Sequence, residues 1–154
     1  MNDYEEFSLA EASDTESFLE QFSQKGEEFA AWSEKGKWRK SQEDRVVASV
    51  SYRGGSKIGV FGVFDGHGGS EASHFCANNI VKMVETVSTN HRGHSVTPST
   101  SSSETCASHL ESTFLELDRR FNKEESESSQ GCGTTALVVW MKGDSCTIAN
   151  CGDS

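Results

Sequence analysis

The sequence of 154 residues has a single proline, no excess of basic residues and no long hydrophobic run. Its five cysteines are an odd number and form no Cys-x-x-Cys pair, so neither a disulfide framework nor a zinc site is indicated. Because 14 Lys and Arg face 24 Asp and Glu, the formal net charge is −10, which disfavours nucleic acid or an anionic membrane as a partner. The N-terminus is acidic, unlike a secretory signal, and no later run can span a bilayer. We therefore expect a cytoplasmic or nuclear protein with no nucleic-acid or membrane partner.

The first part of the chain differs in texture from the rest. Residues 1–34 are acidic and polar, and we expect them to form an N-terminal extension to the domain that follows. Within it, Phe18, Leu19 and Phe22 have the spacing of a short amphipathic helix. The interpretation is a peripheral helix or a loose tail.

Two hairpins are predicted from apolar segments joined by turn residues. In the first, the segment from Arg45 to Tyr52 is followed by Gly54-Gly55-Ser56 and by a second apolar segment that ends at Phe64. In the second, an apolar segment that begins at Gly133 is followed by the turn Lys142-Gly143-Asp144 and by a strand that ends at Asn150. Both should contribute antiparallel strands to a sheet.

Two helices are predicted between these hairpins. Ser70 can cap the first, whose apolar residues recur at three- and four-residue steps as far as Val87, and the second contains Leu110 and Phe121 at helical spacing. Residues 88–108 are dense in Ser and Thr and contain the only proline, so we expect a flexible surface insert there. The helices should pack on a sheet.

Oxygen ligands cluster where the predicted strands begin or end, in Gln42-Glu43-Asp44, in Asp65-Gly66 and in Gly152-Asp153. If the strands are neighbours, their carboxylates and the Gly66 carbonyl meet at one edge, which suits Mg²⁺ or Mn²⁺. Two carboxylates about 4 Å apart repel by roughly 4 kcal/mol at an effective dielectric near 20, so such a cluster either takes up a proton or binds a cation.

Simpler interpretations of the same residues remain open. Asp-Gly and Gly-Gly also make ordinary turns, while the absence of a P-loop lysine and of Gly-x-Gly-x-x-Gly disfavours nucleotide binding. A single histidine such as His67 is often structural. Arg39 lies among Lys35, Lys37 and Lys40, which alone indicates a solvated basic patch, and Lys37 is its rival as a phosphate ligand.

Three segments in order resemble the motifs of the type 2C protein phosphatases, the metal-dependent PPM family of serine/threonine phosphatases. They are Trp38-Arg39-Lys40-Ser41-Gln42-Glu43-Asp44, Val63-Phe64-Asp65-Gly66-His67-Gly68-Gly69, and Gly133-Thr134-Thr135-Ala136 leading to Asn150-Cys151-Gly152-Asp153-Ser154. The resemblance implies that residues 35–154 are the N-terminal portion of the phosphatase domain. It also implies an α+β fold, an αββα sandwich of two antiparallel sheets flanked by helices, which is incomplete in this chain.

The resemblance also implies roles for individual residues. Asp65 would bridge two Mg²⁺ or Mn²⁺ ions, while Glu43 and the Gly66 carbonyl would complete one site. Asp44 would lie behind these ligands, and Asp153 would lie near a third, weaker metal position. For substrate and catalysis, Arg39 would bind the phosphate, and His67 would protonate the departing serine or threonine oxygen.

By the same resemblance, the protein would be a monomeric phosphatase that hydrolyses phosphoserine and phosphothreonine in phosphoprotein substrates with a metal-activated water. Family members continue beyond the position of Ser154 and supply two further metal-binding aspartates, so we expect these 154 residues alone to be inactive. The alternative is a truncated, non-catalytic relative that binds phosphoproteins or a regulator.

Overall fold

The computed structural model describes residues 7–8, 17–24, 27–53, 56–90, 102–124 and 131–154. Its central element is a five-stranded antiparallel sheet in the order β1-β4-β5-β8-β9. The bounds of these strands are β1 (Phe7–Ser8), β4 (Arg45–Arg53), β5 (Ser56–Phe64), β8 (Ala136–Lys142) and β9 (Ser145–Cys151).

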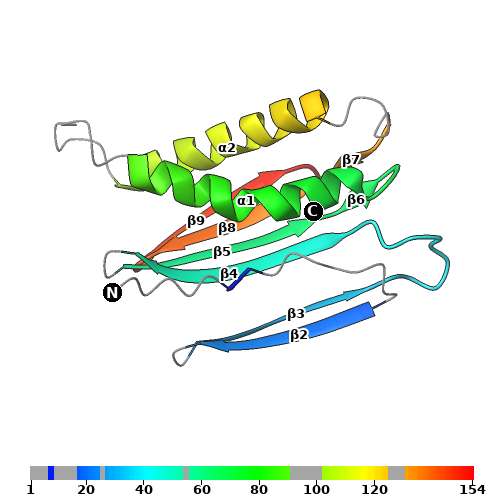
Figure 1. Cartoon of the computed structure of the whole chain (residues 1–154), viewed down its shortest axis with the longest axis horizontal. Helices are drawn as coiled ribbons and strands as arrows, with labels where there is room; N and C mark the ends of the chain where they lie inside the picture. The colour runs from blue at the N-terminus through cyan, green and yellow to red at the C-terminus, as the bar shows by residue number, and fades with distance from the viewer. Residues whose placement is uncertain (1–6, 9–16, 25–26, 54–55, 91–101, 125–130) are drawn as a thin grey trace.

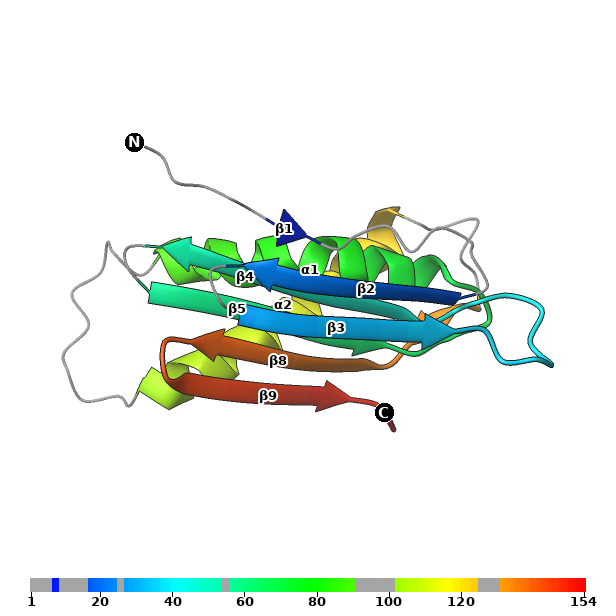
Figure 2. The ribbon, with the colours of Figure 1, turned by 90° about the horizontal axis from the view of Figure 1, so that it is seen from below.

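Two helices cover one face of this sheet, and a separate hairpin lies against the other (Figures 1 and 2). The helices are α1 (Glu71–Asn90) and α2 (Ser102–Glu124), and the hairpin pairs β2 (Ser17–Gln24) with β3 (Glu27–Glu34). A short pair, β6 (Gly66–His67) with β7 (Gly133–Thr134), extends beyond the end of β5. Two antiparallel sheets with helices on an outer face confirm the predicted α+β fold class, and the described residues hold helices on one side only.

The core lies between the sheet and the helices. Alternate residues of the strands, including Val47, Val60 and Val138, are almost fully buried against Ile80 of α1 and Leu110 of α2. Each such side chain contributes roughly 1.5–3 kcal/mol when it leaves water. This burial holds the ends of β4 and β5 in fixed positions.

The hairpins predicted at residues 45–64 and 133–150 are both present, with nine paired positions between β4 and β5. The first helix begins directly after Ser70, whose carbonyl accepts the N–H of His74 at 2.9 Å. A polar link also joins helix to sheet, because Ser51 of β4 donates to the buried carboxylate of Glu85 in α1 at 2.8 Å.

Two local predictions are wrong. Phe18, Leu19 and Phe22 lie in strand β2 and not in a helix, because pairing along β3 decides between two periodicities that a short apolar run satisfies equally well. The flexible insert predicted at 88–108 is contradicted at its two ends, since α1 continues to Asn90 and α2 already begins at Ser102. Residues 91–101 of that insert lie outside the described residues.

Candidate active site

The strand pairing of β4 with β5 brings the predicted acidic residues together. The last pair of this ladder is Arg45 with Phe64, so Asp44 and Asp65 occupy the next opposed positions, where the two strands leave the sheet. Directly opposed residues of an antiparallel pair project to the same side. The register of the sheet therefore places two carboxylates next to each other.

The electrostatics of Asp44 reflect this proximity. Burial raises the pKa of Asp44, and the charge of Asp65 and a hydrogen bond shared with Asp65 raise it further. Arg39 and Arg45 act in the opposite direction without reversing the shift. A carboxylate that is disfavoured in this way is stabilised by a cation.

These residues line a cavity of about 160 Å³. Five predicted site residues contribute to its wall: Arg39, Glu43, Asp44, Asp65 and Gly66. Glu34, Gly36, Ser41 and Gln42 complete the wall. Glu43 and Asp65, which the sequence analysis assigns to one metal site, thus face a common space.

The loop that carries Glu43 is held from inside the protein. The buried guanidinium of Arg45 donates through Nη1 to the carbonyls of Gln42 and Asp44, both at 2.8 Å. The Gln42 side chain donates to the hydroxyl of Ser33 in β3, which ties the loop to the hairpin. The loop is thereby held by both β4 and β3.

Gly66 allows a close approach that no other residue permits. A Cβ atom at this position would lie 2.3 Å from the carbonyl oxygen of Glu43 and 2.9 Å from Oγ of Ser73. The Ser73 hydroxyl in turn donates to the same Glu43 carbonyl at 2.5 Å. Gly66 therefore packs its backbone directly onto the backbone of Glu43.

Thr134, the last residue of β7, and the following Thr135 hold Asp65 by its backbone. The N–H of Thr135 donates to the carbonyl of Asp65 at 2.9 Å, and the hydroxyl of Thr135 accepts the N–H of Asp65 at 3.2 Å. The Thr134 hydroxyl lies 3.1 Å from the same carbonyl, and the Thr135 hydroxyl lies 2.5 Å from that of Ser154. This segment thus positions Asp65, although its own side chains are not acidic.

Two predicted site residues lie outside this cavity. His67 is exposed on β6, paired with Gly133 of β7, and a Cβ on Gly133 would come within 2.5 Å of Nε2 of His67. Asp153 is exposed beyond the end of β9. Neither side chain lines the cavity that holds Asp65.

The donor chemistry of the cavity fits a hard divalent cation, because carboxylate and carbonyl oxygens are the ligands that such ions prefer. The number of candidate ligand side chains is small, however. Among the described residues, no group of three or more His, Cys, Asp or Glu side chains is close enough to hold a metal ion.

Two residues of the site were missed from the sequence. Glu34 lines the cavity but lies in the segment interpreted as an extension, where it is one of many acids without a motif. From the sequence, Arg45 is only the first residue of a predicted strand. Arg45 directly follows Gln42-Glu43-Asp44, and a buried guanidinium needs several hydrogen-bond acceptors. Its position next to this segment was therefore the signal that could have identified it.

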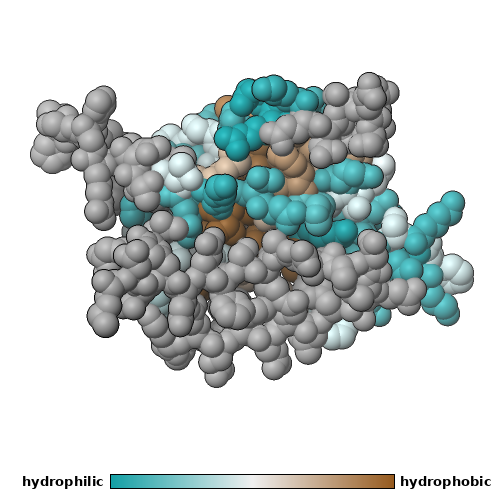
Figure 3. Space-filling model, viewed as in Figure 1, coloured by the Kyte–Doolittle hydropathy of each residue, from teal (hydrophilic) through white to brown (hydrophobic). Residues whose placement is uncertain are grey.

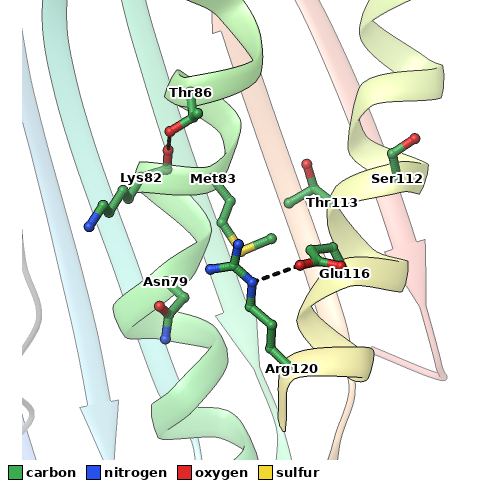
Figure 4. Close-up of a pocket in the computed structure, with 8 residues that line it drawn as sticks. All are labelled: Asn79, Lys82, Met83, Thr86, Ser112, Thr113, Glu116 and Arg120. Atoms are coloured by element: carbon green, nitrogen blue, oxygen red, sulfur yellow. Dashed lines mark hydrogen bonds and ion pairs between the residues drawn. The ribbon is translucent and has the colours of Figure 1, made fainter. Parts of the chain in front are cut away.

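A second cavity, of about 480 Å³, lies between α1 and α2 (Figure 4). In the space-filling view of Figure 3, hydrophobic surface is visible there between hydrophilic side chains. Arg119 and Arg120 both donate to Glu116 and lower its pKa to about 2. The lining residues are Asn79, Lys82, Met83, Thr86, Ser112, Thr113, Glu116 and Arg120. Glu116 is the only acid among them and is already paired, so this cavity lacks the donor set of the first.

The fold is an α+β sandwich with an acidic cavity where strands β4 and β5 leave the sheet. The protein phosphatase 2C family model matches residues 28–154, and the chain belongs to that family. The match begins within β3, so it includes part of the predicted N-terminal extension.

Similar curated proteins carry names of the same family. The chain is 37% identical over 130 residues to "Probable protein phosphatase 2C 32" of Oryza sativa subsp. japonica, covering 83% of this chain and 30% of the relative. It is 32% identical over 120 residues to "Probable protein phosphatase 2C 11" of Arabidopsis thaliana, covering 78% and 29%. The chain thus spans about 30% of the length of these relatives.

A solved structure is also similar. The structure of a sex-determining protein of Caenorhabditis elegans superposes with a TM-score of 0.50 at 27% identity, over 84% of this chain and 27% of that one. In the described part of the chain, neither helix combines the length and the apolar character needed to cross a membrane.

Proposed function

We propose that the protein that carries this chain is a metal-dependent serine/threonine phosphatase, and that the chain supplies its phosphate-binding arginine and part of its metal site. The observation that carries the proposal is the shared cavity, in which Arg39 lies with Glu43, Asp44, Asp65 and Gly66. The match of residues 28–154 to a phosphatase family supports the same assignment.

In this proposal the residues have distinct tasks. Arg39 binds the phosphate of the substrate through charge-assisted hydrogen bonds, for which a planar guanidinium is better suited than an ammonium group. Glu43, Asp65 and the carbonyl oxygen of Gly66 would hold Mg²⁺ or Mn²⁺, and Asp44 lies beside Asp65. When bound, such an ion would lower the pKa of a water molecule, and a water activated in this way could attack phosphorus at neutral pH.

The two residues outside the cavity complete the proposal. His67 directly follows Gly66 although it does not line the cavity, and in this proposal its imidazole would give a proton to the departing serine or threonine oxygen. Asp153 would serve a further, weaker cation position. The substrates would be phosphoproteins.

The first test measures binding of Mn²⁺ to the full-length protein by electron paramagnetic resonance. Asp65→Asn should weaken binding strongly, whereas the control Asp144→Asn, at an exposed aspartate in the β8–β9 turn, should not. Equal binding by all three proteins would contradict the metal assignment.

The second test measures hydrolysis of a phosphoserine peptide by the full-length protein with Mn²⁺. A metal-assisted step contributes several kcal/mol, so Asp65→Asn should lower the rate by roughly a hundredfold to a thousandfold. Tight peptide binding with no turnover in the unsubstituted protein would favour the non-catalytic binding role instead.

A further inference from the structure

The segment that wraps the acidic cavity has an inner and an outer side. Gly36, Arg39 and Ser41 line the cavity, whereas the intervening Lys37, Trp38 and Lys40 do not and are exposed. We call these three residues the outer rim. They are interspersed with lining residues along the chain and are exposed to solvent, so we place them at the mouth of the cavity.

A tight turn presents two of the three residues of the outer rim. The N–H of Arg39 donates to the carbonyl of Gly36 at 2.9 Å, which closes a four-residue β-turn. Lys37 and Trp38 occupy its two corners, where side chains project away from the chain. This hydrogen bond ties Lys37 and Trp38 to Arg39, which lines the cavity, and Lys40 directly follows Arg39.

Trp38 is 91% exposed, more than any other large hydrophobic side chain whose exposure the structure describes, and Leu115 at 66% and Ile148 at 65% follow. Keeping an indole in water is unfavourable, and tryptophan is the residue most enriched at the energetic centres of interfaces. The ammonium of Lys37 lies 5.6 Å from the centroid of the ring. This contact keeps the ring face beside a positive charge.

The charge of the rim is opposite to that of the chain. Overall the chain has a formal charge of −10, whereas residues 35–40 contain Lys35, Lys37, Arg39 and Lys40 and no acid. An acidic cavity with a cationic mouth attracts an anion to the mouth and repels it from the carboxylates behind. Arg39 can then bind a phosphate while Lys37 and Lys40 remain available for neighbouring negative groups.

We propose that the outer rim is a specificity site that binds acidic residues flanking the phosphorylated serine or threonine of a protein substrate. The inference rests on the proposed phosphatase function and deepens it. In an extended peptide, consecutive residues are about 3.3 Å apart, so residues next to the phosphoserine come within reach of the positions on either side of Arg39. The exposed indole would pack on an apolar portion of the same peptide.

The kinetic test uses the full-length protein and compares an acidic phosphoserine peptide with p-nitrophenyl phosphate, which has no flanking residues. In Trp38→Ala and in Lys37→Gln/Lys40→Gln, the ratio of kcat/KM for the peptide to that for the small substrate should fall about tenfold, mainly through KM. Two matched controls are Trp32→Ala, an exposed tryptophan on β3, and Lys123→Gln, an exposed lysine at the end of α2.

The ratio should stay unchanged in both controls. A uniform loss on both substrates in the rim variants, or no change in the ratio, overturns the inference and leaves the phosphatase proposal standing.

A binding measurement separates the two proposals. Fluorescence anisotropy of labelled phosphopeptides in EDTA does not depend on turnover. Tighter binding of the acidic peptide than of a neutral phosphopeptide of equal length, lost in the rim variants, supports the inference even if the protein hydrolyses neither. Equal binding of the two peptides by the unsubstituted protein overturns it.

Discussion

Replacing Gly66 with alanine tests the packing of the site on its own scaffold. The new methyl group would lie 2.3 Å from the carbonyl oxygen of Glu43, whereas ordinary contacts begin near 3.4 Å. The obstacle is backbone on one side and the buried Ser73 hydroxyl on the other. In a close-packed interior, relief therefore requires the backbones to separate by about 1 Å.

The cost can be worked from these contacts. Overpacking of this kind costs about 1–3 kcal/mol, and stretching the hydrogen bond from Ser73 to Glu43 adds about 1 kcal/mol. We expect the free energy of unfolding of the full-length protein, measured by urea denaturation, to fall by about 2–4 kcal/mol. Glu43 would move with its backbone, so Mn²⁺ binding should weaken in parallel.

Gly36→Ala is the matched control. Its Cβ would lie 3.7 Å from Cγ of Arg39, an ordinary contact, although Gly36 lines the same cavity. The expected change in the free energy of unfolding is within about 0.5 kcal/mol. If Gly66→Ala were as stable as this control, the close contact between the two strand ends would be wrong.

Three further changes have defined outcomes. Thr135→Val removes the acceptor of the Asp65 N–H and should lower the free energy of unfolding in urea by about 1–2 kcal/mol. Thr135→Ser keeps the hydroxyl and should leave the free energy of unfolding unchanged. At pH 8, iodoacetamide should modify the exposed Cys146 well before Cys76, whose pKa is raised to about 11 mainly by burial; equal rates by mass spectrometry would contradict this. Two arginines hold the pKa of Glu116 at about 2, below its ordinary 4.5, so its stabilising contribution is complete above pH 4.5 and is lost as the pH falls towards 2. The difference in Tm between the protein and Glu116→Gln should therefore disappear over that range, and a difference that persists at pH 2 would refute the assignment.

Local sequence signals were sufficient for most of the fold. The β4–β5 and β8–β9 hairpins and both helices follow from apolar periodicity and turn residues, which act within a few positions of each other. Strand β2 could not be predicted in this way, because Leu19 is stabilised in a strand by its pairing opposite Trp32 of β3. Such a choice depends on a partner strand and on the sheet behind it.

The candidate site was predictable to a similar extent. Arg39, Glu43, Asp44, Asp65 and Gly66 were assigned from motifs, and all line one cavity. Their individual roles stay predictions.

The contributions of Glu34 and Arg45 depend on the arrangement of distant elements. Glu34 lines the cavity because the β2–β3 hairpin lies against the sheet. Arg45 stabilises the loop because the folded loop directs the carbonyls of Gln42 and Asp44 toward its guanidinium.

The nine-pair ladder between β4 and β5 has a consequence for any effort to reshape this protein. The ladder sets which residues emerge opposite each other beyond Arg45 and Phe64. Because side chains alternate between the two faces of a sheet, deleting one residue within β5 would move each following side chain to the opposite face. The Asp65 carboxylate would then point away from the cavity. Length changes inside this hairpin are therefore more disruptive than most point substitutions in it, and a mutational scan that only exchanges residues would never detect this sensitivity.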